Sequence, residues 1–416
     1  MIERELLLRH DEGCGASIAS KKEAGEGEGV IMTTDIAQTK AAVDEKASIA
    51  ETREDLIRAR HLPGGIYASE EIYRRELEEY FYKDWLFVGR EEQFENPGDY
   101  EARRIIDRPT IIARDKDGTL GAFHNMCRHR GVEVAEGKGN LRHFKCPYHG
   151  WTYDLSGKLL GAAYMKESEG FDPSTCRLPR IHLETWRGNI FISFASEPQP
   201  FTEAMVEFEK DFAQLHTERC RLADVTTLKL NCNWKFLHEN LMDFYHVGVL
   251  HVNTFGARFS WTTDNVSLKD EGGITIRYDA APSTPDGQTL FSKAPWLESE
   301  ENSFACTGFR LPNLTLFGRI DCVKMLVAWP VGPNKCEVLI YVLFPEEFFS
   351  DPDFDEKLKV YKDYQMKIYE EDRSMIESMQ KAMSLPNYVP GRMSVMEKPI
   401  HHFLNGYIDR MFGSGR

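Results

Sequence analysis

The order of apolar and polar positions divides the chain into a polar N-terminal arm, a stretch of short strands, and a longer region of helices and strands. Residues 1–55 include the run KKEAGEGEG and lack apolar periodicity, which predicts a disordered arm. Beyond it, Ser69 followed by Glu70 and Glu71 favours a helix start, and apolar residues then recur at helical spacing as far as Trp85.

Short alternating runs such as TIIARD, GAFHNM and GNIFISF lie between Gly98 and Phe194 and are bounded by Gly, Asp and Pro. This pattern is typical of a small antiparallel β domain, which we place with the preceding helix at residues 56–200. A second domain, residues 201–416, follows. Its predicted helices cover residues 202–218, 233–252 and about 355–383, and its predicted strands include GITIRYDA, LTLFGRI, KMLVAWPV and CEVLIYVLF. The fold class is therefore α+β.

Charge and length exclude several classes of protein. The 416 residues carry a net charge of -15, which would oppose binding to nucleic acid or to an anionic membrane. No apolar run approaches the roughly 18 residues of a membrane span, and the first residues are too charged for a signal peptide. The nine scattered cysteines are unlike a secreted disulfide framework. We therefore expect a cytoplasmic protein that works with small molecules and other proteins. The sequence leaves open whether translation starts at Met1 or Met32.

Two Cys–His pairs in the β domain form the first candidate site. Cys127 and His129 make one pair, and Cys146 and His149 make the other. Thiolates and imidazoles repeated in this way indicate a metal site. A structural zinc ion is one interpretation, but zinc fingers pair Cys with Cys and His with His. One Cys and one His in each half favours a [2Fe-2S] cluster, in which one iron takes both thiolates and the other takes both imidazoles.

Basic residues gather around these pairs in an otherwise acidic chain. They are Arg103, Arg104, Arg128, Arg130, Lys138, Arg142 and Lys145. Two interpretations stay open, a solvated face or a docking surface for an acidic electron-donor protein.

The segment NWKFLHENLMDFYHVGVLHVNTFG, residues 233–256, contains the second candidate site. Helical spacing puts Asp243 and His246 on one face. His251 would point away in an unbroken helix, so the helix must bulge or end near Val247 and Gly248 if both histidines bind one ion. The alternative is a pair of core histidines without a metal.

A carboxylate for this site is predicted on the C-terminal helix. Asp372 interrupts the helix's apolar stripe, and a buried carboxylate needs a cation or an arginine partner. Glu371 at the edge of the stripe is the second choice, and Glu370 points away. The stripe itself comprises Tyr361, Tyr364, Ile368, Met375 and Met379.

These motifs together resemble the catalytic (alpha) subunit of the Rieske non-haem iron oxygenases, the family of the aromatic-ring-hydroxylating dioxygenases. The shared patterns are C-x-H…C-x-x-H with Gly150-Trp151 after it, D-x-x-H-x₄-H, and a later E-D on a helix, spread over about residues 60–400. The resemblance implies a small antiparallel β Rieske domain followed by a helix-grip catalytic domain. It also implies a [2Fe-2S] cluster on Cys127, His129, Cys146 and His149, and a mononuclear Fe(II) on His246, His251 and Asp372.

The resemblance further implies a homotrimer, because Asp243 matches the aspartate that links a Rieske histidine of one subunit to an iron-ligand histidine of the next. Asn240 would lie near the open iron position or make a structural hydrogen bond. Electrons would come ultimately from NAD(P)H through a separate reductase. Whether a ferredoxin takes part, and whether a β subunit joins the ring, stays open.

The substrate is the least determined part of this interpretation. Aromatic residues crowd residues 255–330, and their rings would suit either a planar ring or a quaternary ammonium group. We favour hydroxylation of a small aromatic compound. The alternatives are a monooxygenase of quaternary ammonium or methoxy compounds, such as betaine, carnitine or choline, and, in another class, a Rieske electron-transfer protein without catalysis. The expected pocket residues are Phe255, Phe259, Trp261, Tyr278, Phe291, Trp296, Phe304, Phe309 and Phe317.

Overall fold

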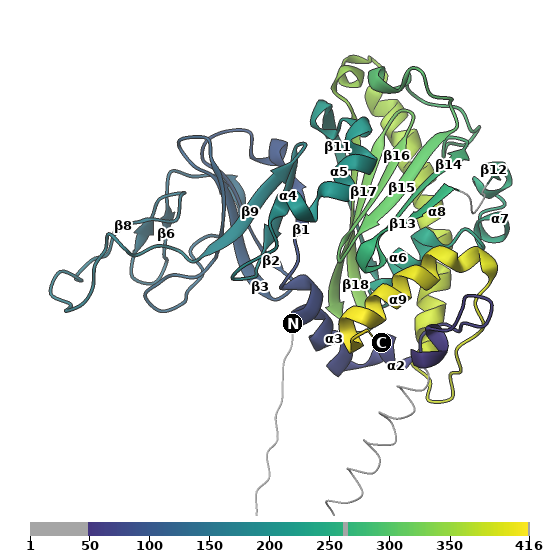
Figure 1. The fold of residues 1–416 in the computed structure, drawn as a ribbon. Coiled ribbons are helices and arrows are strands. Elements are labelled where there is room, and N and C mark those ends of the chain that lie inside the picture. The colour runs from purple at the N-terminus through teal and green to yellow at the C-terminus, as the bar shows by residue number, and fades with distance from the viewer. Residues whose placement is uncertain (1–48, 261–264, 415–416) are drawn as a thin grey trace, which may run out of the picture. The chain divides into compact units, whose positions relative to one another are not determined.

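The computed structural model describes residues 49–260 and 265–414 (Figure 1). Most of the arm predicted for residues 1–55 lies outside this part, as do both candidate start positions. Residues 49–52 are helical, however, and Ile49 and Thr52 are buried. The Thr52 hydroxyl donates to the carbonyl of His61, 3.4 Å away. Residues 49–52 therefore pack with the rest of the described chain, and a single buried apolar residue gives no periodicity by which the sequence could have shown this.

The helix predicted from Ser69 is present. Helix α2 (Gly65–Ala68) precedes it, α3 spans Glu70–Glu76, and a π-helical turn continues over Leu77–Phe81. The Ser69 hydroxyl accepts a hydrogen bond from the backbone N–H of Ile72, 3.3 Å away, which caps the first turn of α3.

Antiparallel strands build the region of the two Cys–His pairs. One sheet has the strand order β1-β10-β9-β4-β3-β2-β5, and a smaller sheet has the order β6-β7-β8. Phe123, Phe144 and Tyr153 pack with Cys127 and Cys146 in a separate small core. The strand bounds are β1 Leu86–Arg90, β2 Asp99–Ile105, β3 Arg108–Arg114, β4 Leu120–His124, β5 Gly137–Asn140, β6 Phe144–Lys145, β7 Thr152–Tyr153, β8 Leu159–Gly161, β9 Arg180–Trp186 and β10 Asn189–Ser193.

The helix predicted for residues 202–218 is broken into pieces. Helices α4 (Phe201–Ala204) and α5 (Val206–Phe212) are followed by two 3-10 turns, and His216 between these turns has a left-handed φ of 44°. Residues 220–230 then form a long strand that the sequence pattern did not predict. Its alternating exposure is that of a strand with one face in solvent.

The second region is an antiparallel sheet with helices packed on it, so the fold is α+β with a helix-grip catalytic part, as predicted (Figure 1). Its strand order is β11-β18-β17-β16-β15-β14-β12, and β13 pairs with β14. The strand bounds are β11 Cys220–Leu230, β12 Phe259–Ser260, β13 Val266–Leu268, β14 Ile274–Ala280, β15 Phe304–Arg310, β16 Leu314–Arg319, β17 Val323–Gly332 and β18 Lys335–Pro345.

Helix α8 spans Phe354–Met383, which confirms the predicted long helix, whereas the final helix α9 (Lys398–Phe412) was not predicted. The predicted apolar stripe of α8 is wrong toward its end, because Met375 and Met379 are exposed. Ile376 and Met383 are buried there instead. In the described part of the chain, no helix is long and apolar enough to cross a membrane.

Short 3-10 helices complete the described elements. They are η2 Glu91–Phe94, η3 Ala213–Leu215, η4 Thr217–Arg219, η5 Gly256–Arg258, η7 Asp270–Gly272, η8 Pro295–Leu297, η9 Glu346–Ser350 and η10 Val395–Glu397.

Candidate metal centres

The two Cys–His pairs lie on loops of the same design. The backbone N–H of Cys127 donates to the carbonyl of Val132, and that of Cys146 donates to the carbonyl of Trp151, each over 2.8 Å. A glycine inside each loop donates back to the carbonyl of its cysteine, and both glycines have positive φ, 79° at Gly131 and 72° at Gly150. Glycine adopts this conformation without steric cost. The two loops therefore present their side chains in matching ways.

The geometry of these loops suits a two-iron cluster. Cys127 and Cys146 are buried, whereas His129 and His149 are exposed. The two histidine Nδ1 atoms face one another at 3.1 Å. Two nitrogens on one tetrahedral metal, at about 2.1 Å each, would stand about 3.4 Å apart. The buried Tyr153 hydroxyl lies 3.3 Å from Cys127 Sγ, where an O–H donor would stabilise thiolate charge.

The segment with the second pair of histidines is not one helix, contrary to the prediction for residues 233–252. Helix α6 (Lys235–Met242) ends at Asp243, which is extended with φ -89° and ψ 99°. A short helix α7 (Val247–Leu250) begins only after His246. The break therefore comes before Val247 and Gly248. Asp243 and His246 do not share a helical face, and the bend between the helices brings the two histidines together.

Three side chains from α6–α7 and α8 converge at one point. His246 Nε2 lies 3.2 Å from His251 Nε2, and Asp372 Oδ1 lies 3.4 Å from the first nitrogen and 3.0 Å from the second. Three ligands bound at right angles to one metal at about 2.1 Å would be about 3.0 Å apart. The nearly equilateral triangle thus fits one face of an octahedral metal ion, the arrangement of the two-histidine, one-carboxylate iron sites.

Other side chains hold this triangle in place. Asp243 Oδ2 lies 3.1 Å from His246 Nδ1, while its other oxygen accepts from the backbone N–H of Tyr245. Glu371 Oε2 lies 2.7 Å from His251 Nδ1. Asn240 Nδ2 donates to Asp372 Oδ1 over 3.1 Å. Glu371, the second-choice ligand, thus contacts the far nitrogen of His251, where it would fix the ring orientation.

The carboxylates and the histidines of the triangle shift one another's pKa values. Burial alone would lower the pKa of His246, but the carboxylates of Asp243 and Asp372 raise it to about 9. Burial alone would raise the pKa of Asp372, but its contacts with His246 and His251 lower this pKa to about 2. Asp372 is therefore an anion at neutral pH, as a metal ligand must be.

A cavity opens beside the triangle, and only some of the predicted aromatic residues line it. Phe255, Tyr278 and Phe317 do so, together with Phe244 and Tyr369, which were not predicted. Phe291 instead packs against Phe344, Phe309 against His238, and Trp296 against His216, because these rings fill the core or lie beneath surface loops. Phe304 lines a neighbouring cavity. Trp261 and the side chain of Phe259 lie outside the described part.

Two basic residues of this cavity, Arg319 and Lys324, were missed at the level of sequence. A lone lysine opening the apolar run KMLVAWPV was the available signal. Of the basic residues around the Cys–His loops, Arg128, Arg130, Lys138, Arg142 and Lys145 are exposed. Arg103 is half-buried and bonds to the backbone of Val88, and Arg104 pairs with Glu133 at 2.6 Å.

Comparison with known proteins agrees with this geometry. Residues 84–180 match the family model of the Rieske [2Fe-2S] domain, and residues 217–413 match that of the ring hydroxylating alpha subunit (catalytic domain). The glycine betaine monooxygenase oxygenase subunit of Chromohalobacter salexigens is 32% identical, over 91% of this chain and 92% of its own. The chloroplastic choline monooxygenase of Spinacia oleracea is 27% identical, over 82% of this chain and 76% of its own.

A solved structure shares the fold. The quaternary ammonium Rieske monooxygenase CntA, in complex with L-carnitine, superposes with a TM-score of 0.71 at 21% identity, over 87% of this chain and 98% of CntA. The chain thus belongs to the Rieske oxygenase catalytic subunits, enzymes that use a [2Fe-2S] cluster and a mononuclear iron and receive electrons from a reductase.

Proposed function

We propose that this chain is the oxygenase component of a Rieske monooxygenase that oxidises a quaternary ammonium compound. The observation that carries the proposal is the 32% identity to a glycine betaine monooxygenase oxygenase subunit over nine-tenths of both chains. Relatives named for choline and carnitine point to the same substrate class. They favour the alternative of the sequence analysis over the aromatic hydroxylation that it preferred, and over a dioxygenase of aromatic catabolism.

Membership in a family of oxygenases also removes the other class of function, an electron carrier without catalysis. The residue assignments follow from the distances above. We assign Cys127, His129, Cys146 and His149 to the cluster, and His246, His251 and Asp372 to the mononuclear iron. The cluster held by these residues would supply single electrons, and the iron would supply the activation of O₂ beside the substrate.

Around these ligands the protein's own residues have separate tasks. Glu371 accepts a hydrogen bond from His251 Nδ1–H and so keeps Nε2 free to bind the metal. Asp243 Oδ2 faces His246 Nδ1 at 3.1 Å, and its charge favours a proton on that nitrogen, which leaves Nε2 for the metal. Asn240 donates to Asp372 and fixes the carboxylate beside the cavity. The apolar walls, including Phe317 and Leu326, exclude water from the reaction.

The reaction consumes O₂, two electrons and two protons. One oxygen atom enters a C–H bond of the substrate and the other leaves as water. If the bond belongs to an N-methyl group, the hydroxymethyl product breaks its C–N bond, the electron pair stays on nitrogen, and formaldehyde leaves with the loss of a proton.

We further propose a homotrimer in which Asp243 also accepts a hydrogen bond from a cluster histidine of the neighbouring subunit. The domains are proposed at residues 56–200 and 201–416, with a cytoplasmic location. A reductase is the electron donor, with or without a ferredoxin.

The test is turnover of the full-length iron-loaded enzyme with a reductase and glycine betaine. The expected product is one methyl group smaller, with formaldehyde in equal amount. No oxidation of glycine betaine, choline or carnitine, combined with hydroxylation of naphthalene, would contradict the proposal.

A further inference from the structure

The cavity beside the iron triangle holds two basic side chains from one β-hairpin. Arg319 ends β16, Lys324 lies at the start of β17, and Lys324 pairs across the hairpin with Phe317. Side chains two apart on a strand, and those opposite on its neighbour, share a face of the sheet. Phe317, Arg319 and Lys324 therefore point to the same side, where all three line the cavity of His246, His251 and Asp372.

These cations are poorly neutralised by the protein. Among the described residues, no carboxylate oxygen lies within 4.0 Å of the charged nitrogens of Arg319 or Lys324. Lys324 is only 7% exposed, and its ammonium donates to Gln365 Oε1 over 2.7 Å. The Gln365 amide is fixed in turn, because its Nε2 donates to the carbonyl of Ser283. Lys324 is therefore held in place by a neutral partner.

Further hydrogen-bond donors lack an acceptor. Within the described residues, Arg319 Nε and the Tyr369 hydroxyl are buried and have no hydrogen-bond partner. Both residues line the same cavity. Arg319 does use Nη1, which donates to the Tyr278 hydroxyl over 2.8 Å. Buried polar groups are normally satisfied, so this wall of the cavity is complementary to a ligand that brings acceptor oxygens.

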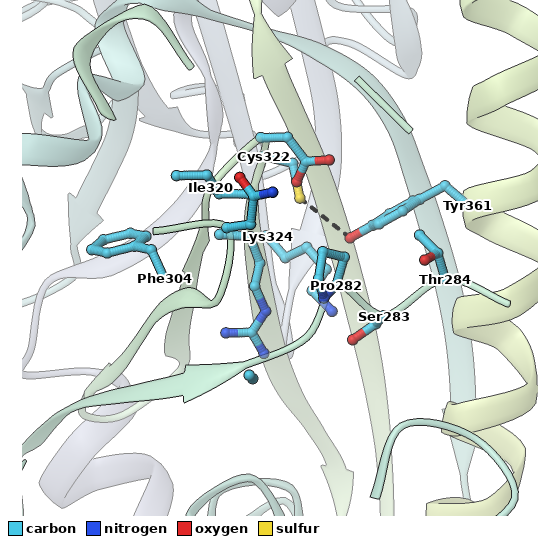
Figure 2. Close-up of a pocket in the computed structure, with 12 residues that line it drawn as sticks. Pro282, Ser283, Thr284, Phe304, Ile320, Cys322, Lys324 and Tyr361 are labelled. Carbon is cyan, nitrogen blue, oxygen red and sulfur yellow. Dashed lines mark hydrogen bonds between the residues drawn. The ribbon is translucent and has the colours of Figure 1, made fainter. Parts of the chain in front are cut away.

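The carboxylates nearest to the hairpin do not meet this need. Asp321 is buried in the turn of the hairpin, but it lines a second cavity, which shares Ser283, Arg319 and Lys324 with the first. Figure 2 shows this second cavity, with Cys322 and Lys324 on the hairpin and Tyr361 reaching across from α8. Asp372 faces His246 and His251 instead, with Oδ1 3.4 Å and 3.0 Å from their Nε2 atoms.

The aromatic rings near the hairpin already face the protein's own cations. The Arg319 guanidinium lies 5.1 Å from the centre of the Tyr278 ring, and Lys324 Nζ lies 5.4 Å from that of Phe317 and 5.8 Å from that of Tyr369. A substrate ammonium placed on these rings would lie beside the Arg319 guanidinium and the Lys324 amine, whose pKa burial and Arg319 lower to about 7. This wall therefore disfavours the cationic end of a quaternary ammonium compound.

We propose that Arg319 and Lys324 bind a carboxylate of the substrate, so that the enzyme selects carboxylate-bearing compounds and rejects choline, which has only a positive charge. The methylammonium part of such a zwitterion rests on the proposed function, whereas the carboxylate rests on this wall alone. Arginine and lysine make strong charge-assisted hydrogen bonds to carboxylates, which would satisfy the unused donors.

A panel of four compounds with the holoenzyme and reductase separates the two proposals. They are glycine betaine (a zwitterion), choline (a cation), benzoate (an anion) and naphthalene (neutral), compared by kcat/KM for product formation. A value for glycine betaine at least about tenfold above that for choline is expected. Equal values would overturn the carboxylate proposal and leave the proposed function intact. Turnover of benzoate alone would retain the carboxylate site and refute the methylammonium substrate, and turnover of naphthalene alone would refute both.

Variants test the residues themselves. Lys324→Met should raise KM for glycine betaine about tenfold to a hundredfold, with a smaller change in kcat. Lys324→Arg should recover most of the loss because it keeps the charge. Arg277→Gln is the matched control, since Arg277 is an exposed cation on the same sheet, paired with Glu300. An unchanged KM in Lys324→Met, or equal losses with choline and glycine betaine, would show that Lys324 does not bind the carboxylate of the substrate.

Discussion

The two metal sites of this chain are built in opposite ways. The cluster histidines His129 and His149 are exposed on short loops, whereas His251 is 1% exposed and Asp372 is largely covered. Electrons have to enter the cluster from another protein and, as we propose, leave it from a cluster histidine toward Asp243 of the neighbouring subunit, so these histidines must lie at the surface of the chain. Oxygen chemistry has to be kept from water and from other molecules, so the iron that performs it must be enclosed.

The sites also differ in how their ligands are held. The cluster loops are fixed locally, by hydrogen bonds between each cysteine and residues a few positions away. The iron triangle joins His246 and His251 to a helix more than a hundred residues later in the chain. Each ligand there needs a supporting partner, namely Asp243, Glu371 or Asn240. We therefore expect the two sites to be lost separately and to fail for different reasons.

The largest effect is expected from Asp372→Ala. This change removes an iron ligand, so turnover should fall by at least about a thousandfold, since even outer partners of a metal cost about tenfold to a hundredfold. The cluster should keep its visible absorption. Iron per chain, measured with the absorption spectrum, checks both statements. Glu370→Gln, an exposed change on the same helix, should keep full iron and activity. Retained mononuclear iron in Asp372→Ala would contradict the assignment.

The next effect concerns the link between the sites. Asp243→Asn should keep both metals but lower turnover by about a hundredfold, because the neutral amide lacks the negative charge that faces His246 Nδ1 at 3.1 Å and that we propose to face a cluster histidine of the neighbouring subunit. Metal analysis with steady-state turnover measures this effect. Turnover within a factor of about three of the wild type would remove Asp243 from the electron route.

A smaller loss should follow from Glu371→Gln. The partner of His251 Nδ1 becomes neutral, which should weaken iron binding about tenfold to a hundredfold without touching the cluster. Iron content after dialysis against a graded series of chelator concentrations gives the affinity. An affinity equal to that of the wild type would mean that Glu371 is not needed to orient the His251 ring, which also packs on Phe255.

The smallest effect is expected at the surface of the cluster site. Arg142→Glu should slow reduction by the donor protein a few-fold at low salt, and the difference should vanish at high salt as charges are screened. Stopped-flow reduction of the cluster measures this rate. The control is Lys359→Glu, an equal change of charge at an exposed residue of α8. If both variants behave alike, the basic residues form only a solvated face.

The contrast between the sites also explains what the sequence could predict. Both cluster loops are local, so their spacing and their glycines, Gly131 and Gly150, were sufficient to place them. The triangle depends on a bend at Asp243 that helical spacing could not reveal. The apolar stripe predicted for α8 was wrong at Met375 and Met379. Their side chains are apolar but lie exposed to solvent. Arg319 and Lys324 meet only through the register of a hairpin, which no local pattern encodes.

The central claim is that the cluster passes its electron to the mononuclear iron site during catalysis. A single turnover tests it most directly. Enzyme reduced at both metals is mixed rapidly with O₂ and glycine betaine, and cluster absorption and formaldehyde are followed together. One formaldehyde is expected for each cluster oxidised, at the same rate, and neither event is expected in Asp372→Ala. Formaldehyde without oxidation of the cluster, or rapid substrate-dependent oxidation of the cluster in Asp372→Ala, would contradict the claim.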